Sequence, residues 1–194
     1  MKLLLYGGTF DPPHQGHINN LTACIQAVQP DQVVVMPAGI PPHKRASATP
    51  ASIRLEMCQC FLPLHPSIAV SDWEIRQGGR SYSIDTVTML QEQYPDARIH
   101  LCVGSDMLLT FTTWRSWQDL LHRVTLVVQS RQPGDEDELA RAARQLEAEG
   151  GHILFAHALA LAMSSSAVRQ GLVPWEYLPP LVQDLVQRYH LYGR

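Results

Sequence analysis

The 194-residue sequence contains no apolar run long enough to form a membrane-spanning helix. Its apolar segment at residues 2–6 is also too short for a secretory signal peptide. Basic residues are not in excess, since the net charge is −3 and the pI is near 6.3. Composition therefore gives no reason to expect a nucleic-acid or membrane partner, and we expect a cytoplasmic protein.

Cysteine is scarce and has no diagnostic spacing. The four cysteines, Cys24, Cys58, Cys60 and Cys102, lie in apolar stretches and form neither a zinc-binding nor a redox pattern, so we expect reduced core residues. The sequence also lacks the G-x-x-x-x-G-K-[ST] phosphate loop and the G-x-G-x-x-G dinucleotide motif. These two widespread kinds of nucleotide site are therefore excluded.

What the sequence does contain is an alternation of apolar and amphipathic segments. Their periodicity predicts strands over residues 2–6, 31–36, 98–103, 123–129 and 152–156, and an irregular or edge strand over 68–75. Helices are predicted over 14–28, 51–62, 83–94 and 135–149, and a packing helix within 174–194 with the apolar stripe Leu178, Leu181, Leu185 and Val186. The first strand, helix and strand form a βαβ unit, which requires parallel strands. We expect one α/β domain over residues 1–194, with a doubly wound, mostly parallel sheet.

The most informative stretch joins the first strand to the first helix and reads G-G-T-F-D-P-P-H-Q-G-H over residues 7–17. Because proline cannot lie inside a helix, this helix should begin at about His14, which places His14 and His17 on one face of its first turn. A helix N-terminus offers free N–H groups, and Gly7 and Gly8 let a ligand approach the backbone. The two imidazoles therefore indicate a phosphate site. Helix capping or a metal pair would also fit, although spacing places no third metal ligand.

Other polar groups follow predicted strands, and ligands of parallel sheets collect at the carboxyl ends of the strands. The loop P-P-H-K-R after the second strand carries Lys44 and Arg45. Such basic pairs are more often solvated, and only its position favours Lys44 as a ligand-binding residue. Gly104 and Asp106 follow the strand at 98–103, where they could touch a ribose or base. Asp106 could equally cap a helix beginning at Met107.

Hydroxyl-rich segments mark two further helix starts. The stretch G-G-R-S-Y-S-I-D-T over residues 78–86 leads into a helix that Ser83 and Thr86 could cap, or from which they could bind a ligand. Near the end of the chain, M-S-S-S-A-V-R-Q-G begins a short helix that Gly171 ends. In the first turn of that helix Arg169 would oppose the helix dipole unless an anion shared the site, and a bound triphosphate would supply that anion.

The run at residues 7–17 resembles the signature of the nucleotidyltransferase superfamily, and its G-T-F-D-P-x-H-x-G-H form is similar to bacterial nicotinate-nucleotide adenylyltransferases. Further segments resemble motifs of that family in the expected order, namely P-P-H-K, G-G-R-S-Y-S, G-S-D, F-T-T-W, R-Q-P-G and M-S-S-S-A-V-R. Ser83 and Thr112 stand where the family commonly has threonine and proline. The resemblance covers nearly the whole chain and implies a Rossmann-like nucleotidyltransferase fold.

The resemblance also implies roles for individual residues. His14 and His17 would hydrogen-bond phosphate oxygens, while Lys44 and Arg169 would hold the β and γ phosphates. The other ATP-binding residues would be Gly8, Thr9, Phe10, Gly104, Asp106, Ser164, Ser165 and Ser166. Ser83, Thr86 and Trp114 would bind the acceptor, with Trp114 stacked on a pyridine ring, while Trp117 would only pack.

The implied reaction moves AMP from ATP to nicotinate mononucleotide, giving nicotinic acid adenine dinucleotide and pyrophosphate in NAD biosynthesis. The sequence shows no Ser-His-acid order, reactive cysteine setting or carboxylate pair for a covalent intermediate, so we expect direct in-line attack. Mg²⁺ would be bound mainly through ATP phosphates and water, without a dedicated protein site.

Several alternatives stay open. The acceptor could be nicotinamide mononucleotide, or phosphopantetheine, whose adenylyltransferases lack the G-G-x-S-Y run. The chain could also be a non-catalytic nucleotide-binding regulator, although its intact histidines, lysine and arginine argue against this, or a histidine-based metallohydrolase. The oligomeric state is open as well, and a homo-oligomer is compatible with the sequence.

Overall fold

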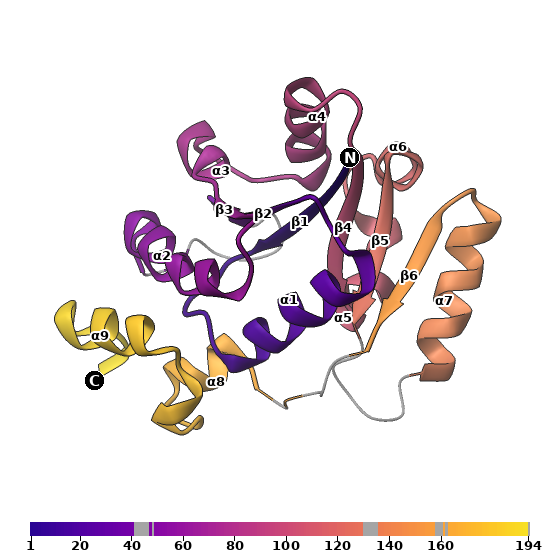
Figure 1. Ribbon diagram of the computed structural model, residues 1–194. Helices are drawn as coiled ribbons and strands as arrows, with labels where there is room; N and C mark the ends of the chain where they lie inside the picture. Colours follow the sequence, from indigo (N-terminus) through magenta and orange to yellow (C-terminus); the bar gives the residue numbers. More distant parts are fainter. Residues whose placement is uncertain (41–46, 48, 130–135, 158–160, 162, 194) are drawn as a thin grey trace.

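The structure, a computed structural model, describes residues 1–40, 47, 49–129, 136–157, 161 and 163–193. Within this part of the chain a six-stranded sheet has the order β3-β2-β1-β4-β5-β6, and each neighbouring pair of strands is parallel (Figure 1). The strands are β1 (Lys2–Gly8), β2 (Gln32–Pro37), β3 (Ile68–Val70), β4 (Arg98–Gly104), β5 (Val124–Gln129) and β6 (His152–Ala156). The predicted parallel α/β sheet is confirmed.

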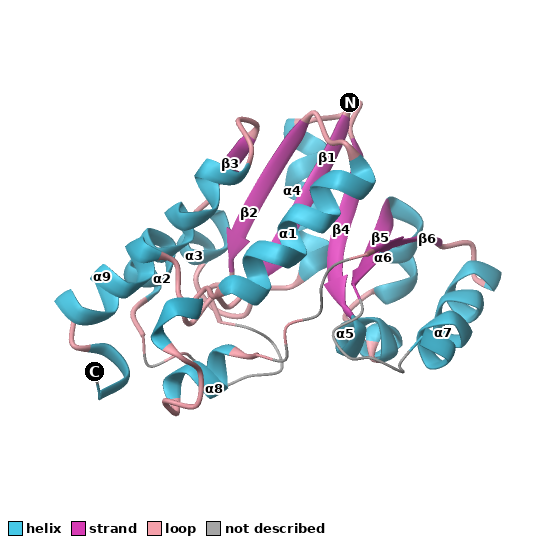
Figure 2. Ribbon diagram, turned by 60° about the horizontal axis from the view of Figure 1, so that its bottom comes forward, coloured by secondary structure: helices cyan, strands magenta, loops and turns pink. Residues whose placement is uncertain are grey.

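Helices cover both faces of this sheet. The α-helices are α1 (Gln15–Val28), α2 (Ala51–Met57), α3 (Trp73–Gln77), α4 (Ser83–Gln93), α5 (Ser105–Leu109), α6 (Trp117–Arg123), α7 (Glu136–Ala148), α8 (Ser165–Arg169) and α9 (Pro180–Arg188). The 3-10 turns are η1 (Cys58–Leu64), η2 (Phe111–Thr113), η3 (Trp175–Tyr177) and η4 (Leu191–Gly193). In Figure 2, α1 crosses the front of the sheet and α4 lies behind it.

The strands explain why both faces are covered. Successive side chains of a strand point to opposite faces, and β1 is apolar at both sets of positions. Leu3 and Leu5 pack into the cluster that includes α4 and α6, whereas Leu4 and Tyr6 pack into the cluster that includes α1 and η1. A strand that is buried on both faces needs helices on both, which is the doubly wound arrangement predicted from the sequence.

The C-terminal part of the chain packs against α2 in a third cluster. Val168 of α8 joins Val182, Leu185 and Val186 of α9 around Met57. These four residues and Met57 are buried, so α8 and α9 are fixed to α2.

The apolar stripe predicted within residues 174–194 is wrong at one position. Leu181 is 37% exposed, and Val182 is buried in its place. Helix α9 begins only at Pro180, and its inner face runs through residues 182, 185 and 186, at the i, i+3, i+4 spacing of a helix. Leu178 reaches the same cluster from extended backbone before that helix.

Two predicted elements also differ from the structure. The edge strand β3 is present but ends at Val70, and helix α3 follows where the prediction continued the strand to residue 75. The hydroxyl of Ser71 accepts a hydrogen bond from the backbone N–H of Trp73 (3.3 Å), a local contact that favours the start of a helix. The helix predicted over 51–62 is α2 followed by the 3-10 helix η1, which contains Pro63.

The cysteines are free thiols, as expected. Cys24, Cys58 and Cys102 are buried, and Cys60 is half-buried. Burial raises the pKa of the Cys60 thiol to about 12. No helix in the described ranges combines the length and apolar character needed to cross a membrane.

The order of the strands creates a crevice beside β1. After β1 the chain adds β2 and β3 on one side, and then returns to add β4, β5 and β6 on the other. The loops that follow β1 and β4 therefore separate, and ligands of open parallel sheets bind at such a point.

Candidate active site

A cavity of about 1340 Å³ opens at the carboxyl ends of β1 and β4. Its wall includes most of the predicted site residues: Gly8, Thr9, Phe10, His14, His17, Ser83, Gly104, Asp106, Trp114, Ser164, Ser165, Ser166 and Arg169. Thr86 does not line it, and Lys44 lies outside the described residues. Residues from both ends of the chain thus share one cavity.

The two histidines lie together at the start of α1. His14 is the N-cap residue in extended conformation, and its ring centroid lies 3.8 Å from that of His17. The backbone N–H of His14 donates to Nδ1 of His17 (3.2 Å). Because Nδ1 accepts this bond, a neutral His17 ring carries its proton on Nε2, where it can donate to a ligand. The capping alternative is therefore realised by His17.

The start of α1 packs closely against the second serine-rich motif. The backbone N–H of Gly16 lies 3.3 Å from the sulfur of Met163, and a Cβ at this glycine would lie 3.1 Å from Cγ of Met163. Nearby, the hydroxyl of Ser165 donates to the carbonyl of Pro12 (2.9 Å). Segments 153 residues apart in sequence are thus joined by direct contacts.

Helix α8 begins as predicted, but Arg169 sits at its other end. The hydroxyl of Ser164 caps the helix by accepting a bond from the backbone N–H of Ala167 (3.1 Å). Arg169 is the last residue of this five-residue helix. The expected conflict between Arg169 and the dipole at the helix start is therefore wrong, because a cation at the C-terminal end of a helix is favourable.

Arg169 reaches across to the loop after β1. Its Nη1 donates to the backbone carbonyl of Asp11 (2.6 Å), and its Nη2 donates to the hydroxyl of Ser166 (3.1 Å). The carboxylate of Asp11 lies farther away, 3.7 Å from Nη1. Arg169 remains more than a third exposed and lines the cavity, so its charge is accessible there.

Asp11 is almost fully buried and collects hydroxyl donors. Ser47 donates to its Oδ2 (2.6 Å), while Thr49 (2.5 Å) and Tyr192 (2.6 Å) donate to its Oδ1. Burial opposes ionisation of this carboxyl, but the three hydrogen bonds and the nearby Arg169 together lower its pKa. Asp11 is therefore a carboxylate at neutral pH.

Of the residues predicted to bind the acceptor substrate, Ser83 and Thr86 have different surroundings. Ser83 is the first residue of α4 and lines the cavity, while Tyr82 occupies the N-cap position without a side-chain cap. Thr86 is 1% exposed and donates to Oε1 of Glu74 (2.6 Å). The predicted contact of Thr86 with the acceptor is therefore not available at the cavity surface, because its hydroxyl is committed to Glu74.

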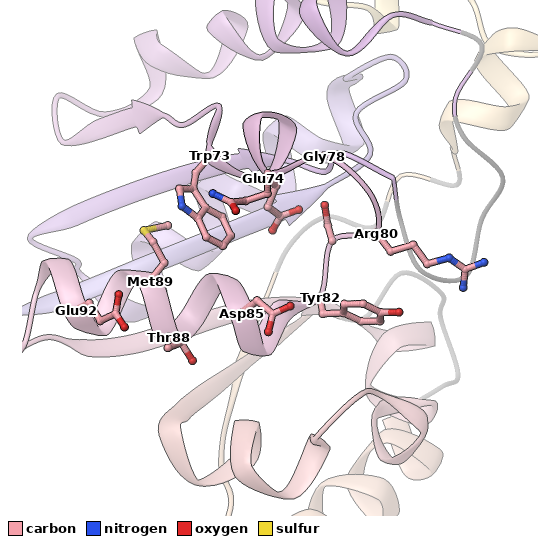
Figure 3. Close-up of a pocket in the computed structure, with 11 residues that line it drawn as sticks. Trp73, Glu74, Gly78, Arg80, Tyr82, Asp85, Thr88, Met89 and Glu92 are labelled. Carbon is pink, nitrogen blue, oxygen red and sulfur yellow. The ribbon is translucent and has the colours of Figure 1, made fainter.

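Glu74 separates this cavity from a smaller hollow of about 490 Å³ between α3 and α4 (Figure 3). The two spaces share Glu74, Arg80, Ser81 and Tyr82 in their walls. In Figure 3 the side chains of Arg80 and Tyr82 extend away from those of Met89 and Glu92. Burial raises the pKa of the Glu74 carboxyl, an effect that hydrogen bonds from Thr86 and Ser81 offset only in part.

Trp114 supplies the aromatic surface of the cavity. Its ring lies against that of the buried Phe111, with ring centroids 5.2 Å apart. Trp114 itself is half-buried and lines the cavity. Trp117 packs on the core cluster, in agreement with the packing role expected for it. Asp106 does not cap α5, because that helix begins at Ser105 with Gly104 as its N-cap. The capping alternative for Asp106 is therefore wrong.

The sequence matches a cytidylyltransferase-like family model over residues 5–171. It is 36% identical to a protein of Acidithiobacillus ferrooxidans named "probable nicotinate-nucleotide adenylyltransferase", over 98% of this chain and 95% of that one. A protein of the same name from Shewanella pealeana is 35% identical, over 99% of this chain and 96% of its own length. This chain belongs to the nicotinate-nucleotide adenylyltransferase family.

Solved structures agree with this family at the level of the fold. The structure of Plasmodium falciparum nicotinic acid mononucleotide adenylyltransferase complexed with NaAD superposes with a TM-score of 0.80 at 19% identity, covering 99% of this chain and 97% of that chain. The Rossmann-like nucleotidyltransferase fold expected from the sequence is thereby confirmed. The resemblance to bacterial nicotinate-nucleotide adenylyltransferases, which the sequence motifs indicated, is confirmed by the curated relatives.

Sequence reasoning missed three groups around the site of this adenylyltransferase. Arg54 is 2% exposed and donates to the carbonyls of Thr9 (2.8 Å) and Gly39 (3.1 Å). The sequence did carry a signal for the burial of Arg54, because this residue lies three positions before Met57 and four before Cys58. That spacing places it on the apolar face of the helix. The other two groups are Glu74 and the Asp11–Tyr192 pair, which depend on contacts between distant segments.

Proposed function

We propose that this protein transfers the adenylyl group of MgATP to nicotinate mononucleotide, forming nicotinic acid adenine dinucleotide and pyrophosphate. The observation that carries the proposal is the joining of the histidine loop after β1 with the serines and arginine of α8 in one cavity. Trp114 and Ser83 line the same cavity, where they would meet the acceptor. Family membership supports the same reaction.

In the proposed reaction an acceptor phosphate oxygen attacks the α-phosphorus of ATP. The bond from that phosphorus to the oxygen of the β phosphate breaks, and pyrophosphate leaves with the electron pair. His14 and His17 stabilise the charge that develops on the α phosphate, and a neutral His17, whose Nδ1 accepts the backbone N–H of His14, would donate from Nε2. Arg169 holds the β and γ phosphates, and Lys44, which the structure does not describe, is proposed to assist it.

The other site residues orient the two substrates. Gly8, Thr9 and Phe10 approach the nucleotide with their backbone, and the hydroxyls of Ser164, Ser165 and Ser166 surround its phosphates. Gly104 and Asp106 meet the ribose or base at the end of β4. Ser83 contacts the acceptor, and the face of Trp114 stacks on its pyridine ring. Such alignment reduces the entropic cost of an in-line transfer between two bound molecules.

Magnesium enters this scheme with ATP. Among the described side chains, no group of three or more His, Cys, Asp or Glu residues is placed to hold a metal ion. We propose that phosphate oxygens and water supply most of its ligands, as is common for Mg²⁺ bound with nucleotides. An ATP-dependent reaction and free thiols suit the cytoplasm, which we propose as the location.

The test is pyrophosphate release from MgATP with one acceptor at a time. Nicotinate mononucleotide, nicotinamide mononucleotide and phosphopantetheine are compared at equal concentration. Release with the first acceptor, and far less with the other two, is the expected result. Release with only another acceptor would keep the adenylyl transfer and overturn the roles of Trp114 and Ser83. ATP binding without release from any acceptor would identify a nucleotide-binding regulator instead.

A further inference from the structure

The carboxylate of Asp11 has its acceptor positions filled by neutral hydroxyls. Thr49 and Tyr192 both donate to Oδ1, and Ser47 donates to Oδ2, at distances of 2.5 to 2.6 Å. Short hydrogen bonds to an ionised oxygen are among the stronger ones in proteins. Three of them stabilise the charge of Asp11, in addition to the attraction of the nearby Arg169.

Arg169 is correspondingly held by neutral acceptors. Its short hydrogen bonds run to a backbone carbonyl and to the hydroxyl of Ser166, while its nearest approach to the Asp11 carboxylate is 3.7 Å. An arginine facing a carboxylate usually closes into a two-pronged pair. Here that pair is not formed, and the guanidinium remains on the cavity wall.

One of the three donors, Tyr192, comes from the end of the chain and also lines the cavity. Tyr192 belongs to the η4 turn, where its φ of 59° and the φ of 50° at His190 lie in the left-handed region that non-glycine residues rarely occupy. Such backbone persists where surrounding contacts hold it. The contacts here include the hydrogen bond that the Tyr192 hydroxyl donates to Asp11, and the same hydroxyl lies 3.3 Å from that of Thr49.

We propose that Tyr192 is a positioning residue that keeps Arg169 available to the triphosphate of ATP by satisfying the carboxylate of Asp11. Without the tyrosine hydroxyl, the carboxylate loses one of its three donors, and its negative charge attracts the guanidinium, which lies 3.7 Å from Oδ2, more strongly. Arg169 then closes onto Asp11, and ATP must break that pair to bind. The inference deepens the proposed function, on which it rests for the role of Arg169.

The experiment measures MgATP binding by calorimetry for the wild type and Tyr192→Phe, together with the KM of each substrate. Tyr192→Phe should weaken MgATP binding about tenfold, the effect expected for one hydrogen bond to a charged group. The KM for nicotinate mononucleotide should change less than about twofold, because Tyr192 acts only through Arg169. Tyr189→Phe is the matched control, since Tyr189 is 42% exposed and its hydroxyl lies 3.4 Å from Glu56.

A second pair of variants separates positioning from a structural role. In an Arg169→Met background, Tyr192→Phe should leave MgATP binding unchanged, because the residue through which it acts is gone. The proposal is overturned if Tyr192→Phe alters binding equally in both backgrounds, raises both KM values together, or has no effect. A wild type that binds MgATP without turnover would refute the proposed function, while the binding comparison would still decide the role of Tyr192. A wild type that does not bind MgATP would refute both.

Discussion

At the level of single side chains, the imidazole of His17 does two separate things. Nδ1 accepts the backbone N–H of His14, and the ring as a whole lines the cavity. Replacing His17 by alanine removes the proposed donor to the developing charge, so turnover should fall roughly a hundredfold or more. The rate of pyrophosphate release at saturating MgATP and nicotinate mononucleotide measures this loss.

The fold should survive His17→Ala, because the substitution removes one cap contact, with a cost of about 1 kcal/mol, and the packing of one ring against His14 and Phe10. Far-ultraviolet circular dichroism and the urea midpoint check this point. His152→Ala serves as the control, since His152 is an exposed residue of β6 outside the cavity. Turnover of His17→Ala within a few fold of the wild type would remove the proposed role.

Glu74 provides a pH-dependent prediction at the same scale. Burial raises the pKa of its carboxyl, so the folded protein holds this proton more tightly than the unfolded chain does. The stabilisation is therefore complete below the unfolded-state pKa of about 4.3 and is lost as the pH rises through the folded-state pKa. Glu74→Gln keeps an oxygen acceptor for Thr86 but cannot ionise. This variant should be more stable than the wild type at pH 7.

Urea unfolding of both proteins between pH 4.5 and 7.5 measures the difference. The wild type should lose stability relative to Glu74→Gln as the pH rises through this range. Glu138→Gln is a suitable control because Glu138 is exposed on α7. A Glu74→Gln variant that is less stable than the wild type throughout would show that the charged carboxylate is favourable in the fold.

At the level of elements, Arg54 ties the loops after β1 and β2 to helix α2. Its guanidinium donates to the carbonyls of Thr9 and Gly39, and Gly39 in turn donates from its N–H to the hydroxyl of Ser81 (2.9 Å). Arg54→Met keeps the length of the side chain but leaves two carbonyls without their donors. The free energy of unfolding should fall by about 2 kcal/mol.

Urea unfolding checks this value, with Arg188→Met as the control. Arg188 is an exposed residue of α9 whose ion pair with Asp184 lies one helical turn away, and such pairs contribute about 0.5 kcal/mol or less. Equal stability of the Arg54→Met and Arg188→Met variants would mean that the buried guanidinium contributes no more than a surface one.

The elements that the sequence predicted well are those with long, regular patterns. The strands at 98–103 and 152–156 and the helices at 83–94 and 135–149 match β4, β6, α4 and α7 within one residue at each end. The five-residue helices α3 and α8 carry little periodicity. Helix α3 was therefore predicted as strand, and Arg169 was placed in the first turn of α8 when it is the last residue.

The candidate site was predictable wherever its residues follow parallel strands, because the topology brings those strand ends together. Thr9, His14 and Asp106 illustrate this, since they follow the neighbouring strands β1 and β4 and line one cavity. Contacts between remote segments gave no local signal. Tyr192 meets Asp11 across 181 positions, and Thr86 was expected at the cavity although its hydroxyl is held by Glu74.

At the level of the whole molecule, the cavity joins the sheet to the C-terminal helices. Ser165, Arg169 and Tyr192 bridge to the loop after β1, whereas α7 lies at the opposite end of the molecule from α9 (Figure 1). A triphosphate held between the histidines and Arg169 would add a further bridge. We therefore expect MgATP to slow amide hydrogen exchange in α8 and η4 much more than in α7.

Hydrogen exchange followed by mass spectrometry, with and without MgATP, tests this expectation. At a hundredfold excess over Kd the ligand stabilises the bound state by about 2.7 kcal/mol, which slows exchange roughly a hundredfold for amides that open only after ligand release. Amides of α7 that exchange through local opening should not change, and Arg169→Met should reduce the effect in α8. Equal slowing in α7 and α8 would show that ATP stabilises the fold uniformly, and unchanged exchange in α8 would place the triphosphate away from Arg169.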